Sequence, residues 1–275
     1  MQMTKLTPTI GAQIDGIDFG NIDAESQQRL RAALIEHEVI FFRNLNLTPQ
    51  QHVRLAEVFG DPLLAKSIVF PSPVGFPQIE VVEYGGDRIP QTDVWHTDII
   101  WQSRPALGAC LYAAVLPPAG GDTLWASMTA AYDALSDRMK TFLSGLTAIH
   151  TWEISSQKKD ALAQRGYDGL LELMKKYPPV EHPVIRTHPV SGKKIIYVTR
   201  SFTTEIKDLP EDESHAILEF LFDHVKKPEF QVRFRWEKGS LAVWDNRATQ
   251  HYAVADYMPH RRRMHRVALA GDPPV

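Results

Sequence analysis

The 275-residue sequence predicts a mainly β fold with flanking helices. It contains many short runs of alternating or β-branched residues, few signals of the crossovers that join parallel strands, and three or four helical stretches. These observations favour a β-sandwich backed by helices. The composition is 44% hydrophobic and 23% charged, as in ordinary globular proteins. Because there is no linker, low-complexity tract or repeat, we expect one domain over 1–275.

The N-terminal third predicts alternating helices and strands. Asp23 is a suitable cap for a helix over 24–37, in which apolar residues recur at helical spacing. Residues 38–43 are rich in β-branched and aromatic side chains and predict a strand. Pro49 suits the first position of a second helix, which we expect to end at Gly60.

The middle and the end of the chain predict further strands and helices. Strands are expected at 79–84, 93–101, 107–116, 147–153, 231–236, 240–244 and 263–269, and helices at 127–143, 158–176 and 210–225. The arginines of 263–269 should alternate in direction, some inward and some to solvent. The polar segment 155–176 is either a lid over a site or a solvent-facing insert, and we favour the insert.

A His-x-Asp pair, His96 and Asp98, and the distant His251 form a candidate metal site. On a strand, residues two apart share a face, so both members of the pair can reach one ion. Two histidines and one carboxylate are the ligands of non-haem Fe(II) oxygenases. An isolated His-x-Asp is a weak signal, and a lone histidine is more often structural, so the interpretation depends on what accompanies them.

A basic run at 260–266 follows His251 and supplies Arg262 and Arg266. A planar guanidinium can bind a carboxylate in a bidentate way, which a chelating dicarboxylate cosubstrate would need at its far end. The alternative is a surface patch for nucleic acid or membrane. The net charge of −3 and the lack of a second basic cluster argue against that alternative, so we expect neither partner.

The single cysteine, Cys110, excludes an intrachain disulfide and fits a reducing cytoplasm. It lies in an apolar run that predicts a buried strand, where its expected role is that of a small core residue. The N-terminus has no apolar signal-peptide region, and no apolar run is long enough to span a bilayer. A cytoplasmic location is therefore expected.

The chain resembles the taurine dioxygenase (TauD/TfdA) family of Fe(II)- and 2-oxoglutarate-dependent dioxygenases. Ordered matches cover nearly the whole sequence, at 10–16, 39–43, 95–98, 120–125, 182–189, 202–204, 244–251 and 261–266. The resemblance implies a double-stranded β-helix (jelly roll) core with iron at its mouth. It also implies that the protein uses 2-oxoglutarate as cosubstrate together with O2, and that it forms a homodimer or homotetramer.

The resemblance further implies roles for seven residues. The iron ligands, which are also the catalytic residues, would be His96, Asp98 and His251. Thr123 and Arg262 would bind the distal carboxylate of 2-oxoglutarate. Arg266 and Phe202 would contact the prime substrate.

The substrate-binding residues depart from those of the taurine enzymes. The loop 59–71 lacks their histidine, although Phe70 can stand for the aromatic that follows it. Lys66 is either a different cationic contact or a solvated loop lysine. Thr92 replaces an asparagine, and Ser156 falls near the place of a pocket aromatic. Since lost donors redirect specificity, these changes indicate a pocket tuned to something other than taurine itself.

The expected activity is hydroxylation of a small anionic organic substrate. Taurine or another alkylsulfonate, releasing sulfite and an aldehyde, is the first choice, with alkyl sulfate esters and aryloxyalkanoates as alternatives. Two other classes stay open from the residues alone. One is a non-catalytic jelly-roll protein, and the other is a zinc hydrolase with the same three ligands, which would have no use for Arg262.

Overall fold

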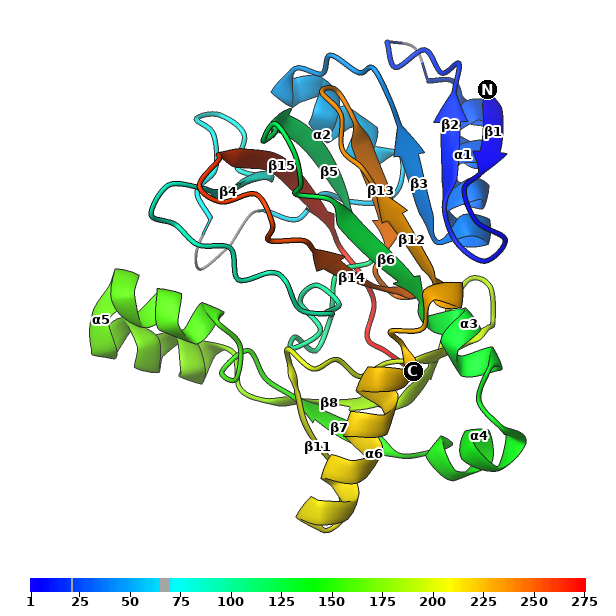
Figure 1. The fold of residues 1–275 in the computed structure, drawn as a ribbon, viewed down its shortest axis with the longest axis vertical. Coiled ribbons are helices and arrows are strands. Elements are labelled where there is room, and N and C mark those ends of the chain that lie inside the picture. The colour runs from blue at the N-terminus through cyan, green and yellow to red at the C-terminus, as the bar shows by residue number, and fades with distance from the viewer. Residues whose placement is uncertain (21, 65–69) are drawn as a thin grey trace.

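The computed structural model describes all residues except 21 and 65–69. A seven-stranded sheet forms its largest layer (Figure 1). In spatial order the strands are β1 (Gln2–Lys5), β2 (Ala12–Asp15), β3 (Val39–Phe42), β13 (Leu241–Asp245), β5 (Gly108–Val115), β15 (Arg262–Leu269) and β4 (Ile79–Tyr84). All neighbours pair antiparallel except β2 and β3.

A second sheet faces the first and closes the core. Its order is β12 (Gln231–Phe234), β6 (Thr123–Ser127) and β14 (Thr249–Ala253), all antiparallel. Aromatic side chains from both sheets fill the space between them, among them Phe41, Trp125, Phe234 and Trp244. The predicted mainly β fold with a jelly-roll core is confirmed.

Two N-terminal helices, α1 (Ala24–His37) and α2 (Pro49–Glu57), pack beside the large sheet. Asp23 caps α1 by accepting from the Ser26 N–H at 2.8 Å. A reciprocal capping box between Thr48 and Gln51 starts α2. α2 ends at Glu57, short of the predicted Gly60.

The remaining elements form the lower part of the molecule in Figure 1. One small sheet contains β11 (Thr203–Ile206), β7 (Thr147–His150) and β8 (Val180–Pro183), and a ribbon pairs β9 (Ile185–Thr187) with β10 (Lys194–Ile196). The helices are α3 (Met128–Asp133), α4 (Asp137–Leu143), α5 (Gln157–Lys176), which projects at the left of Figure 1, α6 (Glu211–His224) and a short 3-10 turn, Pro228–Phe230.

Three sequence predictions need correction. No strand forms over 93–101: His96 makes an isolated bridge and 98–101 form a turn. The helix predicted over 127–143 is two helices, because Ser136 caps the second by accepting from the Met139 N–H. The strand predicted over 147–153 stops at residue 150.

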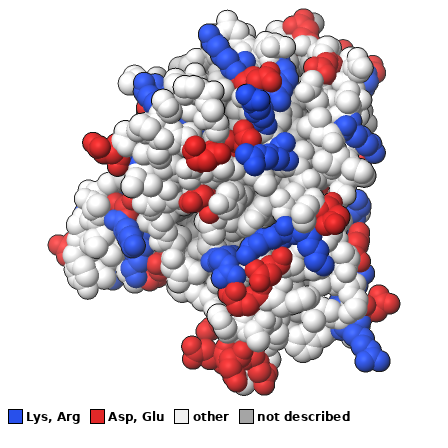
Figure 2. All heavy atoms as spheres, viewed as in Figure 1, with Lys and Arg blue, Asp and Glu red and all other residues white. Residues whose placement is uncertain are grey.

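Figure 2 shows Lys and Arg side chains interspersed with Asp and Glu across the viewed face. Cys110 is fully buried on β5, as predicted. Among the described residues, no helix combines the length and the apolar character needed to cross a bilayer.

Candidate active site

His96, Asp98 and His251 come together in one buried cluster. Their ligand atoms all lie within 4.8 Å of one another. The two histidines are joined by backbone hydrogen bonds of 3.0 and 2.8 Å, and their ring centroids are 4.1 Å apart. Each Nε2 faces Asp98 Oδ1, at 3.8 Å from His96 and 4.0 Å from His251. This arrangement of two imidazoles and one carboxylate could hold a metal ion.

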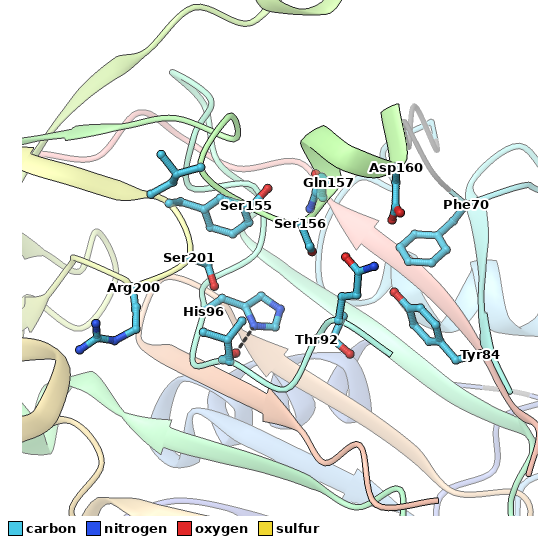
Figure 3. Close-up of a pocket in the computed structure, with 14 residues that line it drawn as sticks. Phe70, Tyr84, Thr92, His96, Ser155, Ser156, Gln157, Asp160, Arg200 and Ser201 are labelled. Carbon is cyan, nitrogen blue, oxygen red and sulfur yellow. Dashed lines mark hydrogen bonds between the residues drawn. The ribbon is translucent and has the colours of Figure 1, made fainter. Parts of the chain in front are cut away.

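Contacts outside the cluster orient His96. Its Nδ1 lies 2.8 Å from the Val94 carbonyl oxygen, drawn as a dashed line in Figure 3. A protonated Nδ1 donating to that carbonyl leaves Nε2 unprotonated and directed toward the cluster.

Asp98 is positioned by a turn rather than by a strand. The Asn246 side chain accepts from the Asp98 N–H and donates to the Asp98 carbonyl, both at 2.8 Å. The same amide donates to the Ala106 carbonyl at 3.1 Å. A side chain nearly 150 residues away in the sequence therefore holds the backbone of Asp98 on both sides of its Cα, and strand alternation does not place its carboxylate beside His96.

The environment favours the ligating protonation states. Burial and, to a lesser extent, the neighbouring His96 lower the pKa of His251 to about 3, although Asp98 acts in the opposite direction. Burial also lowers the pKa of His96. Burial alone would raise the pKa of Asp98, but Arg266 and the two imidazoles outweigh it and the net shift is downward. Neutral imidazoles and an ionised carboxylate are what a divalent metal requires.

Thr123 and Arg262 meet between the two sheets. Arg262 donates through Nε to the Gly121 carbonyl at 3.0 Å and through Nη2 to Thr123 Oγ1 at 3.3 Å. It is 5% exposed, and among the described residues no carboxylate pairs with it. Trp236 and Tyr257 each lie with their ring centroid 5.9 Å from its guanidinium carbon. A buried cation without a carboxylate is costly, so this site favours an anionic ligand.

Arg266 lies beside the cluster and contacts two carboxylates. Its Nη1 donates to both oxygens of Asp98 at 2.9 and 3.0 Å. Nε and Nη2 donate to Glu80 Oε2 at 2.8 and 2.6 Å. The arginines of this strand differ in direction as predicted, since the Arg263 side chain is 37% exposed and pairs with Glu83, whereas that of Arg266 is 17% exposed.

A cavity of about 530 Å³ opens in front of Asp98 and Arg266. Three of the predicted substrate residues, Phe70, Thr92 and Phe202, line it together with His96. Two unpredicted aromatics, Trp101 and Tyr177, add to its walls. Lys66 falls outside the described residues.

A smaller cavity of about 240 Å³ shares Phe70, Thr92, His96 and Phe202 with the first. Figure 3 shows it with Phe70 and Tyr84 at one end and Arg200 at the other, and His96 between them. Ser156 and Gln157 from the start of α5 also line it. The two cavities are thus neighbouring chambers around the same histidine.

Sequence reasoning missed Glu80 and the clamping role of Asn246. Glu80 shares a strand face with Val82 and Tyr84, and an acid on a buried face is a recognisable anomaly. For Asn246 the sequence holds no comparable signal, because its partner is remote in the chain.

Comparisons with known proteins agree with this geometry. A family model for the taurine catabolism dioxygenase TauD, TfdA family matches residues 2–268. The chain is 34% identical over 270 residues to an alpha-ketoglutarate-dependent sulfate ester dioxygenase of Pseudomonas putida, covering 97% of this chain and 88% of that protein. It is 30% identical over 287 residues to the alpha-ketoglutarate-dependent 2,4-dichlorophenoxyacetate dioxygenase of Cupriavidus pinatubonensis, covering 97% and 96%.

A solved structure gives the same result. The crystal structure of a taurine dioxygenase from Burkholderia xenovorans superimposes with a TM-score of 0.84 at 34% identity, covering 100% of this chain and 92% of that one. The chain belongs to the TauD/TfdA family and is a 2-oxoglutarate-dependent dioxygenase. The non-catalytic and zinc-hydrolase alternatives are thereby set aside.

Proposed function

We propose that this enzyme binds Fe(II) through His96, Asp98 and His251 and hydroxylates a small anionic organic substrate. The first choice is taurine or another alkylsulfonate, with release of sulfite and an aldehyde. The main support for this proposal is the buried cluster of His96, Asp98 and His251. The same protein also buries Arg262, which has no carboxylate partner among the described residues. When bound, iron with 2-oxoglutarate and O2 supplies the oxidising power.

The residues around the site suit these groups. Thr123 Oγ1 accepts from Trp236 Nε1 at 2.9 Å and from Arg262 Nη2. With both acceptor positions used, its own proton is free to donate to the distal carboxylate of 2-oxoglutarate. Within the described part of the chain, neither N–H group of Arg262 Nη1 has a partner, so both can donate to the same carboxylate in a charge-assisted contact.

Buried polar atoms near His251 give a further reason to expect a polar ligand. His251 Nδ1, Trp125 Nε1 and Trp244 Nε1 have no hydrogen-bond partner among the residues that the structure describes. The rings of Trp125 and Trp244 lie 6.4 and 5.0 Å from that of His251, by centroid. Such orphaned groups are rare in native proteins unless a ligand or water satisfies them.

Alkyl sulfate esters and aryloxyalkanoates are the alternative substrates. Each carries an anion that could meet Arg266, and relatives named for sulfate esters and for 2,4-dichlorophenoxyacetate lie at 34% and 30% identity. A homodimer or homotetramer and a cytoplasmic location stay predictions.

Succinate formation tests the proposal. The Fe(II)-loaded enzyme is incubated with 2-oxoglutarate, O2 and one compound from each class, and sulfite and aldehyde are measured alongside. Stimulation by a sulfonate with matching sulfite supports the first choice. Stimulation by a sulfate ester or aryloxy acid alone moves the assignment to that class, and metal-dependent succinate that survives in His96→Ala contradicts the assigned ligands.

A further inference from the structure

Glu80 is an acid built into the wall of the larger cavity. It lies on β4 directly opposite Arg266 on β15, and only 7% of its surface is exposed. Both residues line the cavity together with His96 and Asp98. The sheet register therefore places this carboxylate beside the cation that the proposed function assigns to the substrate.

Glu80 takes up much of the binding capacity of Arg266. A guanidinium has five N–H donors. Two of those in Arg266 reach Glu80 Oε2 and Nη1 is directed to Asp98, which leaves the second N–H of Nη2 without a partner among the described residues. In the proposed function Asp98 would be a ligand of Fe(II), so Glu80 is the carboxylate that faces Arg266 without a metal ion beside it.

The second carboxylate oxygen of Glu80 is available to a ligand. Oε1 accepts no hydrogen bond from any described residue, whereas Oε2 accepts two. The only other cation that lines this cavity within the described part of the chain is Lys176, which is exposed. A ligand group meeting Arg266 would therefore also meet an acceptor with negative charge.

We propose that Glu80 is a specificity-determining residue that selects substrates carrying a cationic hydrogen-bond donor close to their anionic group. This rests on the proposed function, in which Arg266 receives the anion. A simple alkylsulfonate or sulfate ester brings negative charge next to Glu80 and has no cationic group of its own to meet that carboxylate. An aminoalkylsulfonate can place its sulfonate on Arg266 and its ammonium on Glu80 Oε1, satisfying both groups.

Equilibrium binding to the anaerobic enzyme loaded with Fe(II) and 2-oxoglutarate tests this inference. Calorimetry compares taurine with propane-1-sulfonate, which has a methyl group in place of the ammonium. The variants are Glu80→Gln, which keeps an oxygen for Arg266 but removes the charge, and Glu83→Gln as a matched control. Glu83 is on the same strand and pairs with Arg261 and Arg263, away from this cavity.

The wild type should bind taurine about tenfold more tightly than propane-1-sulfonate, a difference of about 1.4 kcal/mol. Glu80→Gln should weaken taurine and strengthen propane-1-sulfonate, whereas Glu83→Gln should change neither. The wild-type preference tests the inference even if Glu80→Gln does not fold.

Three results would overturn the inference. Equal affinities for both sulfonates in the wild type, or a Glu80→Gln effect of the same sign on both, would leave the proposed function standing while removing the role of Glu80. If neither sulfonate binds to the wild type or to Glu80→Gln, the sulfonate assignment itself fails and this inference fails with it.

Discussion

Replacing Asn246 by alanine should weaken metal binding although Asn246 is not a ligand. The side chain is 1% exposed and makes three hydrogen bonds, two of them to the backbone of Asp98. Its loss leaves the Asp98 N–H, the Asp98 carbonyl and the Ala106 carbonyl without that partner. The turn that aims the Asp98 carboxylate at His96 and His251 is then free to relax.

The expected loss of stability follows from the three hydrogen bonds that Asn246 makes. A buried polar group left unsatisfied costs about 1–3 kcal/mol, and water entering the space recovers part of that, so we expect a loss of roughly 3–5 kcal/mol in unfolding free energy. Removing groups that orient a metal ligand typically costs about 10–100-fold in metal affinity. Asn246→Asp should also weaken metal binding, although it leaves no cavity. Its carboxylate would face the carbonyl oxygens of Asp98 and Ala106, to which the Asn246 amide donates.

Thermal unfolding and metal titration of the apoprotein separate the two effects. Ser214→Ala serves as the control, because Ser214 accepts a buried hydrogen bond from the Ile206 N–H on another part of the fold. It should lose stability and keep its metal affinity. If the metal dissociation constant of Asn246→Ala stays within about twofold of wild type, the hydrogen bonds of Asn246 do not position Asp98 for metal binding, and the reasoning is refuted.

Three further outcomes are expected. Thr123→Val should raise the dissociation constant of 2-oxoglutarate about tenfold or more, measured by calorimetry. It should also lower the melting temperature, because Trp236 Nε1 loses its acceptor. Unchanged binding of 2-oxoglutarate would count against the role assigned to Thr123. Burial raises the pKa of Glu38 to about 7 from 4.5, so the folded state holds a proton that the unfolded state has released. Stability should therefore fall by roughly 3 kcal/mol as pH rises from about 4.5 to about 7, and Glu38→Gln should remove this dependence in denaturant titrations while the exposed Glu36→Gln does not. Fe(II) should raise the melting temperature of the wild type, chelation should reverse the rise, and His251→Ala should show no rise.

Local signals in the sequence predicted where α1 and α2 begin. The caps of α1 and α2 depend on contacts three residues apart, Asp23 with Ser26 and Thr48 with Gln51, so the sequence contains all that is needed. The strand predicted over 93–101 was wrong because the backbone there is held by Asn246, whose influence no local pattern carries.

The same distinction holds for the site. The sequence by itself determined the chemistry of the groups: two histidines and a carboxylate that could hold a metal ion, and arginines able to bind carboxylates. The tertiary structure alone decided how those groups are used. The pairing of β15 with β4 places Arg266 against Glu80, 186 residues apart, and leaves the guanidinium with few free donors. Strand register is set by the packing of both faces of a sheet, so a side chain's partner across the strands is a property of the whole fold.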